Sequence, residues 1–161
     1  MKELRLGFIG AGFIARFQAE ALRNVRGAQL AGVYALKGAE ELAAQANKTG
    51  IGDCRVYSSV AELCKNVDAV ALLAPNFVRV ELMEKVTEAV RAGAELKGII
   101  CEKPLGRTVA EAKRLVDLVV PFIEKKGIKV DDLGRQRMLA GMDELKNRAK
   151  TLIQMADEGA F

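Results

Sequence analysis

The sequence contains no histidine among its 161 residues. Histidine is the commonest general acid–base group near neutral pH and a frequent metal ligand, so these residues hold no histidine-based catalytic or metal site. Cysteine is scarce as well, and Cys54, Cys64 and Cys101 form no Cys-x-x-Cys pair. An odd number of scattered cysteines argues against a disulfide framework and favours the reducing cytoplasm.

Long apolar runs and a strong charge of either sign are also missing. The longest apolar stretches fall far below the ~18 residues expected of a membrane-spanning helix. Met1 leads into Lys2-Glu3-Leu4, which does not resemble a secretory signal. The 25 basic and 21 acidic residues leave a net charge of +4, too small and scattered to indicate a nucleic-acid surface. We therefore expect a cytoplasmic globular protein with no membrane or nucleic-acid partner.

Short apolar runs alternate with helical patterns along the first 130 residues. The runs predict strands over residues 4–9, 29–34, 55–57, 67–74 and 98–101, and the first and the last two of these are expected to be buried. Helices are predicted between them, the first over residues 14–25 and closed by Gly27. Ser59 with Glu62, and Thr108 with Glu111, are capping-box pairs that start later helices. This alternation predicts an α/β fold with a doubly wound parallel sheet, the Rossmann fold.

The alternation stops at residue 131. We therefore expect a Rossmann domain over residues 1–130 and an extra C-terminal helix within an extension over residues 131–161. Apolar residues recur there at helical spacing and would form one face, which could contact a second copy of the chain: Leu139, Met142, Leu145, Ala149, Leu152, Ile153 and Ala156.

A glycine-rich turn follows the first predicted strand and opens the first predicted helix. It reads Gly10-Ala11-Gly12-Phe13-Ile14-Ala15, a G-x-G-x-x-A pattern that is informative in this position. Gly10 would allow the tight turn, Gly12 the close approach of a pyrophosphate, and Ala15 close packing of the helix on the strand. The helix N-terminus would hold the phosphates, unless the turn serves packing alone.

The end of the second predicted strand bears on the choice of cofactor. An NAD-specific site carries an acidic residue there, about 20 positions past the turn, to bind the ribose 2′-hydroxyl. This sequence has Tyr34-Ala35-Leu36-Lys37 instead. Lys37 could reach a 2′-phosphate, which favours NADP over NAD, although Lys37 could equally be an ordinary loop lysine.

Three stretches together resemble the glucose-fructose oxidoreductase and inositol dehydrogenase family, known as Gfo/Idh/MocA. They are the opening G-F-I-G-A-G-F-I-A, the segment from Ala74 to Arg79 with the sequence A-P-N-F-V-R, and the C-E-K-P-L motif from Cys101 to Leu105. The resemblance covers residues 4 to about 130 and implies an NAD(P)-dependent oxidoreductase. Such an enzyme transfers a hydride between nicotinamide and a sugar, cyclitol or related hydroxy compound.

The resemblance also implies roles for individual residues. Pro75 and Asn76, which follow Ala74, match a pair that lies beside the cofactor ribose in the family. Arg79 stands where the family usually has histidine. Glu102, Lys103 and Pro104 match the E-K-P motif, whose lysine lies between nicotinamide and substrate. Lys103 would then polarise the substrate hydroxyl, although it could instead be only a residue at the end of a strand.

Family members continue into a second α/β domain that supplies substrate contacts and an aspartate–histidine pair. We expect that domain to be absent from these 161 residues, because only a helix is predicted after residue 130. Since there is also no histidine, the family's proton-transfer group cannot be assigned to any residue of this sequence. One hypothesis is therefore an oxidoreductase represented by its cofactor-binding half. The alternative is a stand-alone dinucleotide-binding or interaction module without catalysis, and a third is a Rossmann-like scaffold that has lost its ligand.

Overall fold

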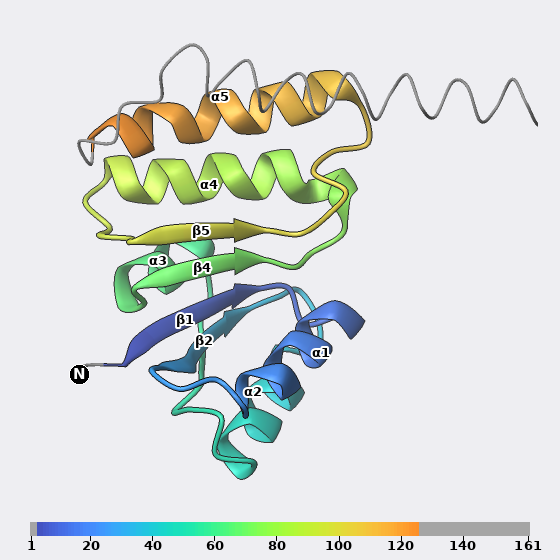
Figure 1. Ribbon diagram of the computed structural model, residues 1–161, viewed down its shortest axis with the longest axis vertical. Coiled ribbons are helices and arrows are strands. Elements are labelled where there is room, and N and C mark those ends of the chain that lie inside the picture. Colours follow the sequence, from blue (N-terminus) through green and yellow to red (C-terminus); the bar gives the residue numbers. More distant parts are fainter. Residues whose placement is uncertain (1–2, 126–161) are drawn as a thin grey trace, which may run out of the picture. The chain divides into compact units, whose positions relative to one another are not determined.

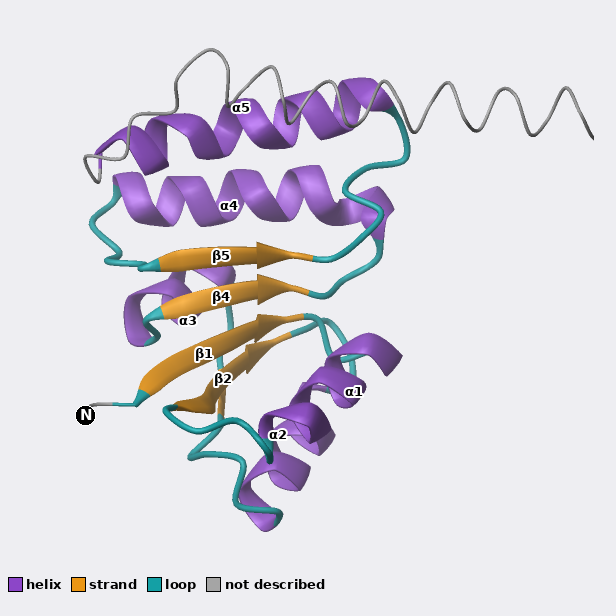
Figure 2. Ribbon diagram, viewed as in Figure 1, coloured by secondary structure: helices purple, strands orange, loops and turns teal. Residues whose placement is uncertain are grey.

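A computed structural model describes residues 3–125 of the chain. It has alternating strands and helices, drawn in Figures 1 and 2. The strands are β1 (Leu4–Ile9), β2 (Ala28–Tyr34), β3 (Arg55–Val56), β4 (Ala69–Leu72) and β5 (Gly98–Cys101). The α-helices are α1 (Phe13–Leu22), α2 (Ala39–Lys48), α3 (Val60–Asn66), α4 (Arg79–Arg91) and α5 (Val109–Lys125), and a short 3₁₀-helix η1 spans Asn76–Val78.

The five strands form one parallel sheet in the order β3-β2-β1-β4-β5. β1 lies at its centre, where Phe8 pairs with Val33 of β2 and with Ala71 of β4. Helices α1 and α2 lie on one face of the sheet, and α3 and α4 lie on the other (Figure 2). This is the doubly wound Rossmann arrangement that the alternation predicts.

The chain divides into two compact units, one ending at Arg107 and the other beginning at Thr108. The sheet and its four helices belong to the first unit, and α5 is the described element of the second. The predicted helix within residues 131–161, its contact with a second copy and the predicted boundary at residue 130 all lie outside the described residues. None of the helices between residues 3 and 125 is long and apolar enough to cross a membrane.

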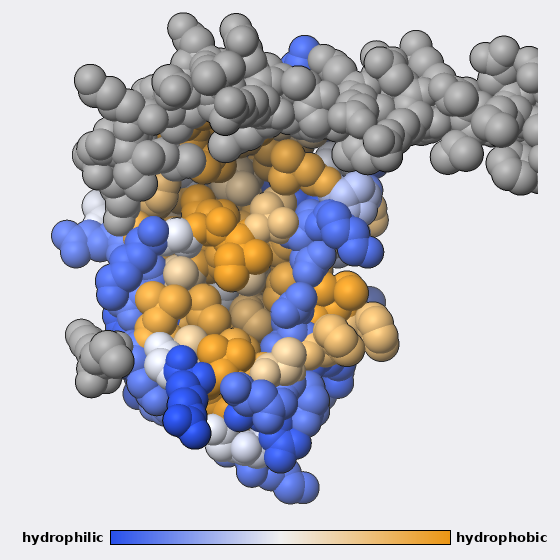
Figure 3. Space-filling model, in the orientation of Figure 1, coloured by the Kyte–Doolittle hydropathy of each residue, from blue (hydrophilic) through white to orange (hydrophobic). Residues whose placement is uncertain are grey.

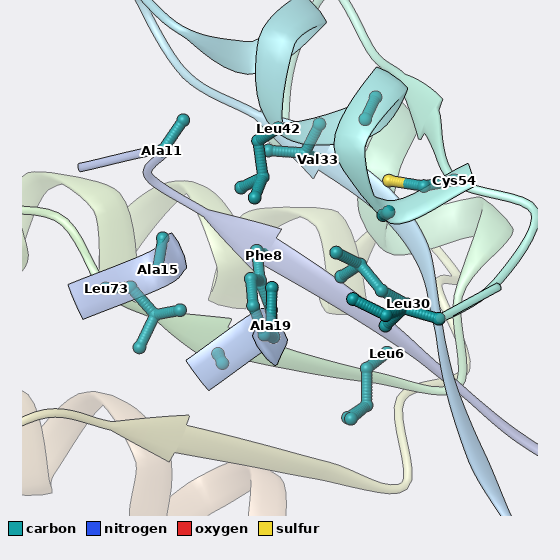
Figure 4. Packing of buried hydrophobic residues seen from close by; sticks show 14 of the residues in the cluster. Leu6, Phe8, Ala11, Ala15, Ala19, Leu30, Val33, Leu42, Cys54 and Leu73 are labelled. Carbon is teal, nitrogen blue, oxygen red and sulfur yellow. The ribbon is translucent and has the colours of Figure 1, made fainter. Parts of the chain in front are cut away.

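A cluster of buried apolar residues lies between the sheet and helices α1 and α2 (Figure 4). Leu6, Phe8 and Leu30 point from the strands toward this cluster, and Ala15 and Ala19 of α1 are buried in it. Small side chains on the buried side of a helix let its backbone approach the sheet closely. Ala15 therefore has the packing role predicted for it, and it brings the start of α1 close to the end of β1.

Two predicted boundaries are wrong. Helix α1 ends at Leu22 rather than running to Val25 with Gly27 as its closing residue. The amide of Val25 donates to the carbonyl of Leu22 at 2.9 Å, a bond between residues three apart that is typical of a 3₁₀ turn at the end of a helix. Gly27, at φ +82°, turns the chain into β2 instead. Strand β4 covers only Ala69–Leu72 and not residues 67–74.

The burial predicted for β5 is also wrong. The strand is only partly buried, and Ile100 is 54% exposed. A parallel strand is buried on both sides when it has neighbours and helices around it, whereas β5 is the edge strand of this sheet. Figure 3 shows hydrophobic residues gathered at the middle of the face that is turned toward the viewer.

The predicted capping box at the start of α3 is half formed. The hydroxyl of Ser59 accepts from the Glu62 amide at 3.1 Å, as expected of an N-cap. The Glu62 carboxylate, however, bonds to the amide and hydroxyl of Ser58 rather than to the amide of Ser59. The extra hydroxyl at Ser58 offers the carboxylate a second bond, which explains the shift of one residue.

Candidate functional site

The predicted site residues follow the carboxyl ends of neighbouring parallel strands. Gly10 follows β1, Ala35 follows β2, Leu73 follows β4 and Glu102 follows β5. Because the strands are parallel, these ends meet at one edge of the sheet, with β1 between β2 and β4. The strand order reverses at β1, and open α/β sheets bind ligands at the crevice formed by such a reversal.

Gly10 lies where the ends of β1, β2 and β4 meet. Its φ of +117° lies in a region that favours glycine, and a Cβ there would lie 2.7 Å from the backbone nitrogen of Ala74. The Gly10 amide donates to the carbonyl of Tyr34 at 2.8 Å, and the Ala74 amide donates to the carbonyl of Ile9 at 3.0 Å. The predicted role of Gly10 in a tight turn therefore agrees with its geometry, since any side chain would push the turn away from β4.

Gly12 is a glycine for a different reason. Its backbone, at φ −75° and ψ −168°, suits any residue, and a Cβ built on it would meet no atom of the described chain within 4 Å. Gly12 is the N-cap of α1, and no side chain caps that helix. The free amides and the positive end of the helix dipole are thus open to an anion that comes close to the backbone. Phosphates would fit this cradle.

The residues that follow Gly12 complete the cradle. Phe13 is 81% exposed at the first position of α1, and its ring stacks on that of Phe17 with centroids 6.5 Å apart. Ile14 is half-buried and packs against the core, while Ala15 is fully buried. The turn therefore offers backbone amides from a start of α1 that is packed on the core, with the Phe13 ring exposed.

Two basic residues, Lys37 and Arg16, lie where the end of β2 approaches the glycine turn. Lys37 is exposed, as is Leu36, in the loop between β2 and α2. The Nη2 atom of Arg16 is 3.4 Å from the position that a Cβ on Gly38 would occupy, and Arg16 Nε donates to the carbonyl of Ala11 at 3.4 Å. The sequence prediction missed Arg16. Its signal was a cation in the first turns of a helix, where acidic residues are usually preferred.

The segment after β5 carries the E-K-P motif. The Glu102 carboxylate accepts from Gln18 Nε2 of α1 at 3.1 Å and from the Lys103 amide at 3.1 Å. The peptide bond between Lys103 and Pro104 is cis, and both of these residues are exposed. The side chain of Glu102 is therefore tied to α1, and Lys103 lies at the surface on the edge of the sheet that bears the glycine turn.

The segment after β4 is connected to the E-K-P segment by Arg79. Pro75 precedes η1 and Asn76 begins it, so Ala74, Pro75 and Asn76 stand between β4 and α4. Arg79 is 3% exposed and donates to carbonyl oxygens in both segments. This residue, which departs from the family pattern, is another that the sequence prediction left without a role.

The uncapped start of α1 and the nearby guanidinium of Arg16 are the positive groups of this edge of the sheet. Among residues 3–125, no group of three or more cysteines and carboxylates could hold a metal ion. Burial raises the pKa of the Cys101 thiol at the end of β5, and the positive charge of Arg79 opposes that rise. The fold and this site define a dinucleotide-binding Rossmann domain.

Comparison with known proteins places the chain in a family. The protein-family model named GFO_IDH_MocA matches residues 4–122. It is described as an oxidoreductase family with an NAD-binding Rossmann fold. The chain belongs to this family, as the three sequence motifs predict.

Two curated relatives illustrate the match. The glucose-6-phosphate 3-dehydrogenase of Bacillus subtilis (strain 168) is 33% identical over 113 residues, which are 70% of this chain and 29% of the relative. The inositol 2-dehydrogenase of Agrobacterium fabrum is 32% identical over 118 residues, which are 73% of this chain and 33% of the relative. The chain thus spans about a third of the length of these relatives.

A solved structure agrees with them. The UDP-N-acetylglucosamine 3-dehydrogenase of Acidithiobacillus ferrooxidans superposes with a TM-score of 0.59 at 30% identity and covers 74% of this chain and 36% of that one. A shorter similarity of another kind involves the glutamate–tRNA ligase 1 of Gluconacetobacter diazotrophicus, 40% identical over 55 residues. It covers 34% of this chain and 12% of the ligase, too little to assign a family.

Proposed function

We propose that this chain is the cofactor-binding part of an NAD(P)-dependent oxidoreductase that acts on a sugar, cyclitol or related hydroxy compound. The observation that carries the proposal is the open space at Gly12, at the uncapped start of α1 and beside the reversal in strand order. Nothing inside the described chain requires glycine there, whereas close approach of a pyrophosphate does. The relatives named as sugar and inositol dehydrogenases support the substrate class.

We assign the parts of the cofactor to the segments of the site as follows. The amides of residues 12–15 would hold the pyrophosphate, and residues 74–76 would lie beside a ribose. Glu102, Lys103 and Pro104 would border the nicotinamide, which when bound supplies the chemistry of hydride transfer. Lys103 would donate a hydrogen bond to the substrate hydroxyl or carbonyl oxygen and so stabilise the charge that develops there.

We propose NADP as the preferred cofactor. The loop after β2 carries no carboxylate that would bind a ribose 2′-hydroxyl and repel a 2′-phosphate. Lys37 is exposed in this loop, and the guanidinium of Arg16 lies against Gly38 at its end. Guanidinium groups bind phosphates through paired hydrogen bonds, so Arg16 supports this preference more strongly than Lys37 does.

We also propose a cytoplasmic location, which the three free cysteines support. It would be tested by fractionating cells that express the full-length gene.

Titration of the purified chain with NADPH and with NADH tests the proposed function. A ligand at 100 times its dissociation constant stabilises the native state by about 2.7 kcal/mol, which a thermal-shift assay detects. Gly12→Asp should abolish the response, because a carboxylate would crowd and repel the pyrophosphate. Stabilisation by neither nucleotide would overturn the proposal, as would unchanged affinity in the Gly12→Asp variant.

A further inference from the structure

Arg79 is a buried cation whose hydrogen-bond acceptors are all backbone carbonyls. It is the first residue of α4 and 3% exposed. Its Nη1 atom donates to the carbonyls of Glu102 at 2.5 Å and Leu105 at 3.4 Å, and also to that of Pro104. Its Nη2 atom donates to the carbonyl of Ala74 at 3.1 Å, while its buried Nε has no hydrogen-bond partner among residues 3–125. One side chain therefore joins the segments that follow β4 and β5.

The burial of Arg79 costs free energy, so its presence indicates that the joined segments need a fixed position. A buried guanidinium without a carboxylate partner loses hydration that an apolar side chain would not lose. A leucine or methionine could fill a similar space at the start of α4, but it could not pull carbonyls from two segments toward one point. Charge-assisted bonds to several carbonyls fix distance and direction together.

We infer that Arg79 is a positioning residue, which holds the E-K-P segment, and with it Lys103, at a fixed distance from the segment formed by Ala74, Pro75 and Asn76. This inference rests on the proposed function, in which residues 102–104 border the nicotinamide, and it takes the ribose beside residues 74–76 to be the one attached to nicotinamide. The glycine turn, which would hold the pyrophosphate, is fixed to the end of β2 by the bond from the Gly10 amide to the Tyr34 carbonyl, and this bond does not involve Arg79. Loss of Arg79 should therefore weaken binding of the nicotinamide half alone.

The test compares a whole dinucleotide with an analogue that lacks both nicotinamide and the ribose attached to it. Calorimetry would use whichever of NADPH and NADH binds the wild-type chain more tightly, and the matching 2′-phospho-ADP or ADP. Arg79→Gln should weaken the dinucleotide at least tenfold and the analogue less than twofold. The matched control is Arg91→Gln, since Arg91 is an exposed arginine at the other end of α4, and it should change neither affinity.

Hydrogen exchange gives an independent readout. In Arg79→Gln, amide exchange should accelerate at residues 102, 103 and 105 and stay unchanged over residues 10–16. If Arg79→Gln does not fold, Arg79→Lys is read in the same way, because one ammonium keeps the charge but cannot reach both segments as the forked guanidinium does.

The outcomes separate the two proposals. Equal losses for dinucleotide and analogue, or no loss for either, would overturn the positioning role while leaving the proposed function in place. A wild-type chain that binds neither dinucleotide nor analogue would overturn the proposed function and this inference with it.

Discussion

A Cβ atom on Gly10 would lie 2.7 Å from the backbone nitrogen of Ala74, whereas a Cβ on Gly12 would meet nothing within 4 Å. Two glycines in one turn thus serve different purposes. The first allows β1 to pass close to the end of β4, and the second leaves the start of α1 open. This difference separates the contribution of the turn to folding from its contribution to binding.

Alanine should have a different effect at each position, mainly on stability at Gly10 and mainly on binding at Gly12. Gly10→Ala places a side chain at φ +117° against the backbone of β4, and we expect the free energy of unfolding to fall by about 3 kcal/mol or more. Gly12→Ala should cost about 1 kcal/mol or less, as expected of an N-cap change, yet lower the affinity for dinucleotide because the methyl group points into the cradle. Urea denaturation and calorimetry would measure the two effects. Wild-type affinity in a folded Gly12→Ala variant would contradict the assignment.

The proposed preference for NADP makes a prediction at Arg16. Arg16→Gln should weaken NADPH binding roughly tenfold or more, since a hydrogen-bonded charge pair contributes about 1.5 to 3 kcal/mol. NADH has no 2′-phosphate, so its affinity should change less than twofold. Arg23→Gln is the control, because Arg23 adjoins the other end of α1 and pairs with Glu20 in solvent. Equal weakening of NADPH and NADH would show that Arg16 supports the turn and does not select the cofactor.

The fold was largely predictable from the sequence because its signals are local. Apolar runs, the glycine turn and the Ser59 N-cap each need only a few neighbouring residues to be recognised. The edge position of β5 was not predictable in this way, since the exposure of Ile100 depends on which strands lie beside it. A run of apolar residues looks the same at the centre and at the edge of a sheet.

The same distinction between local patterns and contacts across the fold applies to the candidate site. The motif residues could be proposed from the sequence because their spacing is a pattern, and in the structure they lie at one edge of the sheet. Arg16 and Arg79 were missed because their roles depend on contacts across the fold, with Gly38 in one case and with the carbonyls of Ala74 and Glu102 in the other. A side chain that bonds to backbone atoms leaves no partner type in the sequence to search for.

Stability should decrease in acid through Asp68. Its side chain is 13% exposed, accepts from the Arg5 amide at 2.9 Å and pairs with the Arg5 guanidinium at 3.3 Å. These bonds lower the pKa of Asp68, so its contribution is complete above the unfolded pKa of about 3.9 and is lost as pH falls below that value. Asp68→Asn should cost about 1 to 3 kcal/mol at neutral pH.

Urea denaturation from neutral pH down to about pH 3 would test this, with the difference between wild type and Asp68→Asn shrinking below about pH 4. Asp53→Asn is the control, since Asp53 is exposed and pairs with Arg55 in solvent, and it should change stability by less than about 0.5 kcal/mol. Glu62, whose pKa is lowered by its bonds to Ser58, should leave a smaller acid dependence in the Asp68→Asn variant. A constant difference at every pH would contradict a role for the charge.

The three thiols should react slowly and unequally while the chain is folded. Burial raises the pKa of Cys54 to about 12, with a contribution from Asp53, and that of Cys64 to about 11. The pKa of Cys101 is also raised by burial, but this residue is only partly buried and Arg79 opposes the shift. The thiolate is the reactive form, so at about pH 8 a disulfide reagent such as Ellman's should modify Cys101 first and the other two only as the protein opens. In concentrated guanidinium chloride all three thiols should react at once. Cys101→Ser should remove the fastest phase of thiol modification in the folded protein. Rapid modification of two or more thiols in the native protein would show that the packing around α2 and α3 is looser than the structure has it.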